Sequence, residues 1–162
     1  MVNTSKVTDR RSLRFNSIGE LAVEVDRLAA AERTGKLRRN GNWTLGQICG
    51  HLAAWINYAY DGFPMGPPPW LIRVILRSRV KKYLRDGMPA GVRIPKVKNG
   101  TFATEPLSVE EGTERLRRAI KRLQSGEPAR FDSPAFGKLS DEQRIALNLR
   151  HAELHLSFFV PR

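Results

Sequence analysis

Three histidines are the residues of this chain whose type and spacing could do chemistry. His151 and His155 stand four residues apart, which places two imidazoles on one face of a helix, about 5–6 Å from each other. His51 lies in another predicted helix, and its ring could supply a third nitrogen if the two helices face each other. The trio predicts a site for a divalent transition metal. Ni, Zn and Fe are the candidates, since imidazoles without a thiolate suit all three.

Three protein ligands leave a coordination position open, as in catalytic rather than structural metal sites. Water bound there could have its pKa lowered to about 7, and a substrate thiol could be held as thiolate. The structural alternative is a buried neutral histidine that needs only one hydrogen bond. Because all three histidines lie mid-helix on faces predicted to point inward, we favour the metal. No organic cofactor is expected.

Four polar residues share these helical faces and are the candidate catalytic residues for orienting a nucleophile. A helical wheel places two beside His51 and two on the stripe that leads to His151. They are Gln47, Tyr58, Asn148 and Arg144. Each could instead serve only as a capping or surface residue.

A protein base and a thiol ligand are both missing from the pattern. The sequence contains no H-E-x-x-H motif, and Glu153 points away from the two histidines of its own helix. Cys49 lies on the opposite side of its helix from His51, so we interpret it as a small buried residue. The nucleophile would then come from solution.

Four helices are predicted from Ser/Thr-x-x-Glu/Gln sequences, which satisfy the free N–H groups at a helix start. The first runs from Ser17 to a stop at Gly35, and the third from Ser108 to Gly126. The second begins at Thr44 and continues to about residue 61. The last begins at Ser140 and is expected to pass Phe158 before Pro161 ends it. Strand signals are poor, which indicates an all-α fold.

A crossover of more than 40 residues, about 62–107, separates the second and third helices. It opens with a proline-rich turn, and 70–85 is predicted to be an additional basic helix that begins after Pro69. Four-helix bundles with one long crossover are an established variant. We therefore expect one domain over 1–162, with a short flexible N-terminal arm at about 1–14.

The composition limits partners and location. The chain has 162 residues and a net charge of +12, with a sequence pI of about 10.7. Such charge attracts polyanions without specifying one, and nucleic-acid motifs are absent, so nucleic acid is not the expected partner. One cysteine excludes an internal disulfide, and no apolar run approaches the ~20 residues that cross a bilayer. We expect a cytoplasmic protein.

Three segments resemble an uncharacterised bacterial domain family of the DinB-like superfamily: 42–52 (NWTLGQICGHL), 136–140 (FGKLS) and 151–156 (HAELHL). The likeness covers about residues 11–159. It implies a four-helix bundle, often dimeric, with a long connection between helices two and three. It also implies a divalent metal on His51, His151 and His155. Some members of the superfamily are transferases that use low-molecular-weight thiols, and others look like hydrolases or isomerases.

Two residues depart from what the resemblance implies. Leu154 stands where relatives often carry another histidine, and Phe158 where many have a glutamine. The histidine trio is intact, so the first hypothesis is a metal-dependent enzyme that activates a thiol or water for transfer or hydrolysis on a small molecule. The alternative is a non-catalytic binding module, whose basic crossover helix docks on an acidic partner, either nucleic acid or a membrane surface.

Overall fold

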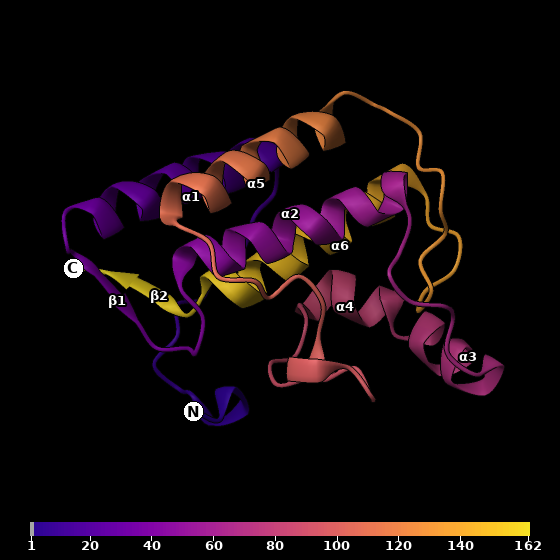
Figure 1. Cartoon of the computed structure of the whole chain (residues 1–162). Coiled ribbons are helices and arrows are strands. Elements are labelled where there is room, and N and C mark those ends of the chain that lie inside the picture. Colours follow the sequence, from indigo (N-terminus) through magenta and orange to yellow (C-terminus); the bar gives the residue numbers. More distant parts are fainter. Residues whose placement is uncertain (1) are drawn as a thin grey trace.

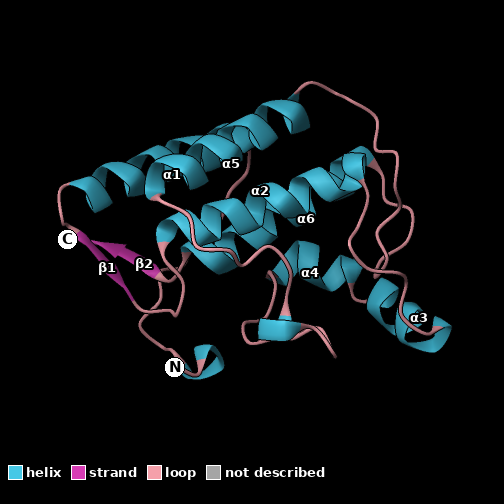
Figure 2. Ribbon diagram, viewed as in Figure 1, coloured by secondary structure: helices cyan, strands magenta, loops and turns pink. Residues whose placement is uncertain are grey.

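The computed structural model describes residues 2–162 and is mostly helical, as the all-α prediction requires. Figures 1 and 2 show long helices lying side by side, with shorter helices to one side of them. The four long helices are α1 (Ile18–Arg33), α2 (Leu45–Asp61), α5 (Val109–Gln124) and α6 (Asp141–Leu156). The crossover carries α3 (Trp70–Ser78), α4 (Val80–Asp86) and the 3-10 turn η2 (Lys98–Gly100), and a further 3-10 turn, η1, spans Thr4–Lys6. None of the described helices is long and apolar enough to span a bilayer.

Hydrogen bonds from side chains define the helix starts, as predicted. At α2 the Thr44 hydroxyl accepts from the backbone N–H of Gln47, whose side chain accepts in return from the Thr44 N–H. The same reciprocal pairing opens α5 and α6. At α1 the Ser17 side chain caps the helix, but the Glu20 carboxylate accepts from the N–H of Asn16.

Helix α2 packs against α5 on one side and α6 on the other, so it is the element that places His51. The approach to α5 is very close, because Gly46 of α2 and Gly112 of α5 meet with no side chain between their backbones. The core between the long helices consists mainly of leucine, with alanine and isoleucine. Its fully buried members include Leu21, Val25, Leu28, Leu45, Leu116 and Leu156.

The structure corrects two predicted helix boundaries. The last helix ends at Leu156, with Ser157 as its C-cap, so Phe158 lies beyond the helix and not on the histidine stripe. There the chain turns into strand β2 (Phe159–Pro161), which pairs antiparallel with β1 (Leu37–Arg39). The basic crossover helix is also not continuous, because it divides at Arg79 into α3 and α4.

The segment predicted as a flexible arm lies along the bundle and makes specific contacts with it. The Arg11 guanidinium binds the Glu24 carboxylate at 2.5 Å and also the backbone oxygen of Phe159. Just after the arm, the backbone N–H of Phe15 donates to the buried Glu153 carboxylate. Hydrogen exchange would measure how mobile the arm is with these contacts in place.

Candidate metal centre

The three histidine rings converge between α2 and α6. The Nε2 atom of His51 lies 3.2 Å from that of His151, and the Nε2 atom of His155 lies 3.0 Å from that of His151. Each ring offers one nitrogen to a group in which all three atoms lie within 4.8 Å of one another. The structure therefore brings together the three residues that the sequence pattern singled out.

A backbone hydrogen bond sets the tautomer of His51. Its Nδ1 lies 2.9 Å from the carbonyl oxygen of Phe102, an acceptor that requires the proton to be on Nδ1. The lone pair of Nε2 then points at the other two rings. Metal-bound histidines are commonly oriented by such a hydrogen bond from the other ring nitrogen.

Two of the three separations between the ring nitrogens are close to those of a transition-metal site. Metal–nitrogen bonds of about 2.0–2.1 Å at tetrahedral angles separate two ligand nitrogens by about 3.3 Å, close to the 3.0 and 3.2 Å found here. Hydrogen bonding alone satisfies the cluster less well. A proton on the Nε2 of His151 could point at only one of its two neighbours, whereas a cation would satisfy all three lone pairs.

Burial keeps the imidazoles neutral, which is the form that binds metals. It lowers the pKa of His51 to about 4. The pKa values of His151 and His155 also lie well below the ordinary range, first because of burial and then because of the neighbouring imidazoles. His51 is fully buried, whereas His151 and His155 are partly exposed.

Two tryptophans form walls beside the histidines. The Trp43 ring stacks on His155, with centroids 5.7 Å apart and an interplanar angle of 11°. Trp55 meets His151 edge-on at 5.7 Å. Within residues 2–162 the buried Nε1 of Trp55 has no hydrogen-bond partner, so this indole carries an unused donor.

The four predicted catalytic residues are not hydrogen-bonded to the imidazoles within the described part of the chain. Gln47 completes the α2 capping box and also reaches the carbonyl of Thr104 at 3.4 Å. Arg144 is buried, donates to Asp141 and lies over the ring of Tyr60.

The other two candidates lie nearer to the histidine walls. The amide of Asn148 donates to the carbonyl of Arg144 at 3.0 Å, one turn before His151. Tyr58 packs edge-on against Trp55 with centroids 5.6 Å apart, so Trp55 lies between Tyr58 and His151. Burial raises the pKa of the Tyr58 phenol, which keeps it protonated.

Glu153 and Cys49, the two residues expected not to be ligands, lie outside the histidine group. Glu153 points away from the rings, where its carboxylate binds Arg150 at 2.9 Å and the backbone of Phe15. Cys49 is fully buried, and burial raises the pKa of its thiol to about 12. Neither residue is placed to act as base or nucleophile at the cluster.

Sequence reasoning missed Trp43 and the carbonyl of Phe102. Both reach the histidines from outside the two helices that carry them, and helical periodicity says nothing about such contacts. The only signal for Trp43 was its place in the NWT segment at the start of α2.

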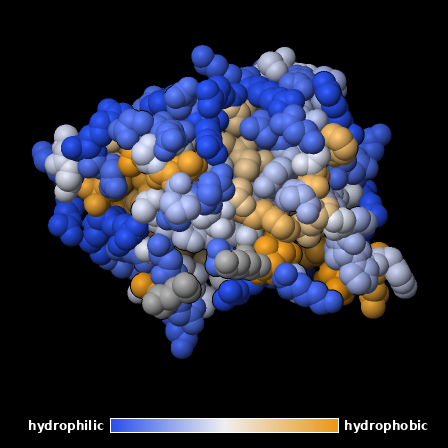
Figure 3. Space-filling view, in the orientation of Figure 1, coloured by the Kyte–Doolittle hydropathy of each residue, from blue (hydrophilic) through white to orange (hydrophobic). Residues whose placement is uncertain are grey.

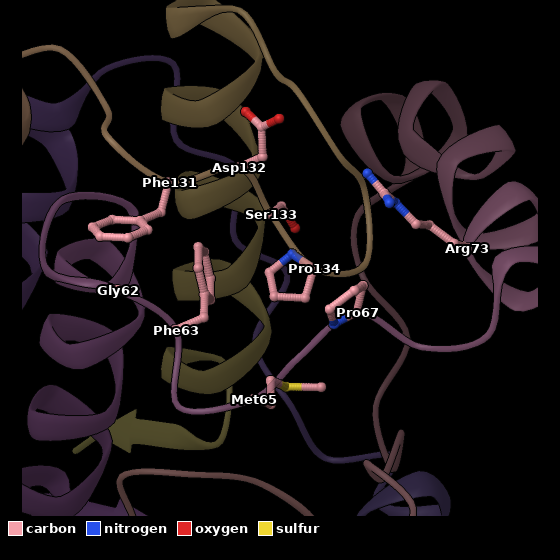
Figure 4. Close-up of a pocket in the computed structure, with 9 residues that line it drawn as sticks. All are labelled: Gly62, Phe63, Met65, Pro67, Arg73, Phe131, Asp132, Ser133 and Pro134. Carbon is pink, nitrogen blue, oxygen red and sulfur yellow. The ribbon is translucent and has the colours of Figure 1, made fainter.

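Two surface pockets lie elsewhere in the molecule. The larger has a volume of about 310 Å³ and lies past the C-terminal end of α2, where Phe63 lies between Phe131 and Pro134, with Arg73 of α3 at its rim (Figure 4). The other, of about 250 Å³, lies between α2 and α5, beside Asn57 and Arg115. Neither is lined by the histidines. The aromatic contacts from Trp55 to Tyr58 and from Tyr58 to Phe63 extend from the cluster to the larger pocket.

Fold and site together define a small helical protein with a buried three-histidine cluster compatible with metal binding. The chain belongs to the family described as "Protein of unknown function (DUF1569)", which matches residues 7–162. No curated protein and no solved structure matches it.

Proposed function

We propose that this protein is a metal-dependent enzyme in which His51, His151 and His155 hold a divalent transition metal, and that its bundle is of the DinB-like type. The convergence of the three Nε2 atoms carries the proposal. Ni, Zn and Fe remain the candidates, because three imidazoles suit each of them. When bound, such a metal supplies Lewis-acid activation of a thiol or water at the coordination position that the protein leaves open.

The nucleophile comes from a substrate and not from the protein. Glu153 and Cys49 are unavailable, since the first is bound to Arg150 and the second is a buried thiol. A low-molecular-weight thiol, or water, is then the species activated, and the reaction is transfer to, or hydrolysis of, a small molecule. The homodimer and the cytoplasmic location expected from the sequence stay predictions.

The surroundings of the cluster favour a guest with an apolar part and a hydrogen-bond acceptor. Trp43 and Trp55 offer ring faces and edges, and Trp55 also offers its unpartnered Nε1 donor. Of the four polar candidates we retain Tyr58 and Asn148 for orienting the guest. Gln47 and Arg144 are held by a capping box and an ion pair.

Metal content of the purified protein is the direct test. After supplementation with Ni, Zn or Fe, elemental analysis should find close to one metal per chain in the wild type and none in His151→Ala. Leu154→Ala, on the same helix but outside the trio, is the matched control and should keep its metal. Equal metal content in His151→Ala and the wild type, or no metal in either, would contradict the proposal.

The open position can be tested separately with cobalt, whose visible spectrum reports its ligands. Adding glutathione to the cobalt-loaded protein should change the spectrum if a thiol can bind at the site. Trp55→Phe keeps an aromatic side chain but removes the N–H donor, so it should bind cobalt normally and glutathione more weakly. A cobalt spectrum that no thiol alters would contradict thiol activation while leaving the metal site intact.

A further inference from the structure

Helix α3 exposes its apolar face to solvent, whereas the four long helices bury theirs. Five large apolar side chains on this nine-residue helix are exposed, and Trp70 is 76% accessible. The others are Leu71, Ile72, Val74 and Ile75, each about half exposed or more. Soluble proteins bury such a face, and a contiguous exposed one marks an interaction site.

The polar side of α3 faces the protein. Arg73 and Arg77 stand four residues apart, and both guanidinium groups lie against Gly137 in the loop before α6. Arg77 also donates to the carbonyl oxygen of Phe136 at 3.2 Å. These contacts attach α3 to the protein through its arginine side, so its apolar side chains point toward solvent. In Figure 1 α3 projects from one end of the molecule, and Figure 3 shows hydrophobic side chains reaching the surface in that region.

Exposed cations lie next to this apolar face, mainly on the segment that follows α3. Residues 70–86 contain six Lys and Arg, all exposed, and a single acidic residue, Asp86. Arg79, Lys81 and Lys82 follow directly on the apolar run. The whole chain adds to the effect with a net charge of +12.

We propose that α3 and α4 form a docking surface for a membrane that contains anionic lipids, with the apolar residues of α3 inserted at the level of the headgroups. Helices that lie in this interface combine Trp and aliphatic residues on one side with Lys and Arg beside them. Each basic side chain near an anionic surface raises the affinity by about fivefold. The inference goes beyond the proposed enzyme activity and does not depend on it.

The charge and the apolar residues together favour an anionic membrane over a second copy of the chain or nucleic acid. A second copy of the chain would bring the cations that follow α3 against the same cations of its partner, and nine residues fall well short of the roughly 20–30 per side in a stable protein interface. Nucleic acid would neutralise the cations but leave the apolar side chains in water. An anionic bilayer satisfies both parts of the surface.

Sedimentation with vesicles tests the proposal on the full chain. At about 0.15 M salt, where free surface charges are largely screened, the wild type should sediment with phosphatidylcholine vesicles that contain phosphatidylglycerol. It should sediment much less with pure phosphatidylcholine. The double variant Leu71→Ser with Ile75→Ser should bind at least about tenfold more weakly, because each substitution removes an inserted aliphatic side chain.

The matched control is Val23→Ser, which alters an exposed valine on α1, far along the chain from α3, and should leave vesicle binding unchanged. Circular dichroism shows whether each variant is folded. The charge-reversal variant Lys81→Glu tests the surface without touching the apolar residues and should also weaken binding.

Four results would overturn the proposal. The first is no binding of the wild type to anionic vesicles, and the second is equal binding to neutral ones. The third is undiminished binding of the Leu71/Ile75 variant, which would mean that charge alone attracts the protein. The fourth is a wild-type dimer in sedimentation velocity that the same variant converts to monomer, which would assign the face to a second copy.

Discussion

The close approach of α2 and α5 yields a sharp prediction for Gly112→Ala. A Cβ atom at position 112 would lie 2.2 Å from the carbonyl oxygen of Gly46 and 2.7 Å from its Cα, whereas ordinary contacts begin near 3.4 Å. The clash is with backbone, so no side-chain rotation relieves it. The two helices would have to separate by about 1 Å.

The magnitude follows from two opposing effects. Overpacking of a dense core costs about 1–3 kcal/mol, and a contact with rigid backbone belongs at the upper end of that range. Alanine in a helix interior regains about 1 kcal/mol over glycine. We therefore expect the free energy of unfolding to fall by about 2 kcal/mol, which lowers the melting temperature by roughly 4–8 °C for a chain of this size.

Urea denaturation followed by circular dichroism measures the change. The matched control is Gly19→Ala in the first turn of α1, where the nearest atom to an added Cβ is the Ser17 hydroxyl at 3.7 Å, so this variant should be as stable as the wild type or more so. Metal binding by Gly112→Ala should weaken as well, because Gly46 lies five residues before His51 on α2. If Gly112→Ala were as stable as Gly19→Ala, the helices would not approach as described.

Two further predictions concern titratable groups. Because burial raises the pKa of Cys49 to about 12, its thiol should resist alkylation in the folded protein at about pH 8 and react fully in denaturant; rapid labelling of the native protein would contradict its burial. The folded pKa of His51 is about 4, below its ordinary 6.5, so below pH 6.5 the unfolded chain binds the proton first. In metal-free protein this should lower the free energy of unfolding by about 3 kcal/mol between pH 6.5 and 4. In His51→Gln the free energy of unfolding should depend less on pH. An equal dependence in this variant would mean that other groups cause the loss of stability in acid.

Local signals in the sequence were enough to locate the four long helices. At α2, α5 and α6 the capping residues are hydrogen-bonded within one turn of the helix, so the residues that mark each start also cause it. The inward direction of the three histidines followed from helical periodicity in the same way. Contacts within about four residues are what a sequence pattern can predict.

Features that depend on distant contacts were not predictable. Strands of three residues are too short for alternation to be seen, and β1 and β2 form only because the segment after α1 meets the C-terminal segment. The end of α6 at Leu156 has the same origin, since no glycine or proline marks it and the residues after it are drawn into the pairing with β1. The division between α3 and α4 likewise has no breaker residue at Arg79.

The histidine cluster joins stability and function through a single property, its burial. Burial of the rings favours their neutral form, which leaves three nitrogen lone pairs free to bind a cation. Without a cation, these lone pairs repel one another. In the metal-free protein the histidine cluster therefore lowers the stability of the fold, although its geometry is suited to bind a metal. Because a metal binds the folded chain in preference to the unfolded one, binding should raise the free energy of unfolding. Hydrogen bonding between Phe102 and His51 extends this coupling to the crossover, since the loop that follows η2 helps to fix the ring. Metal loading should then protect the backbone near residue 102 from hydrogen exchange as well as α2 and α6.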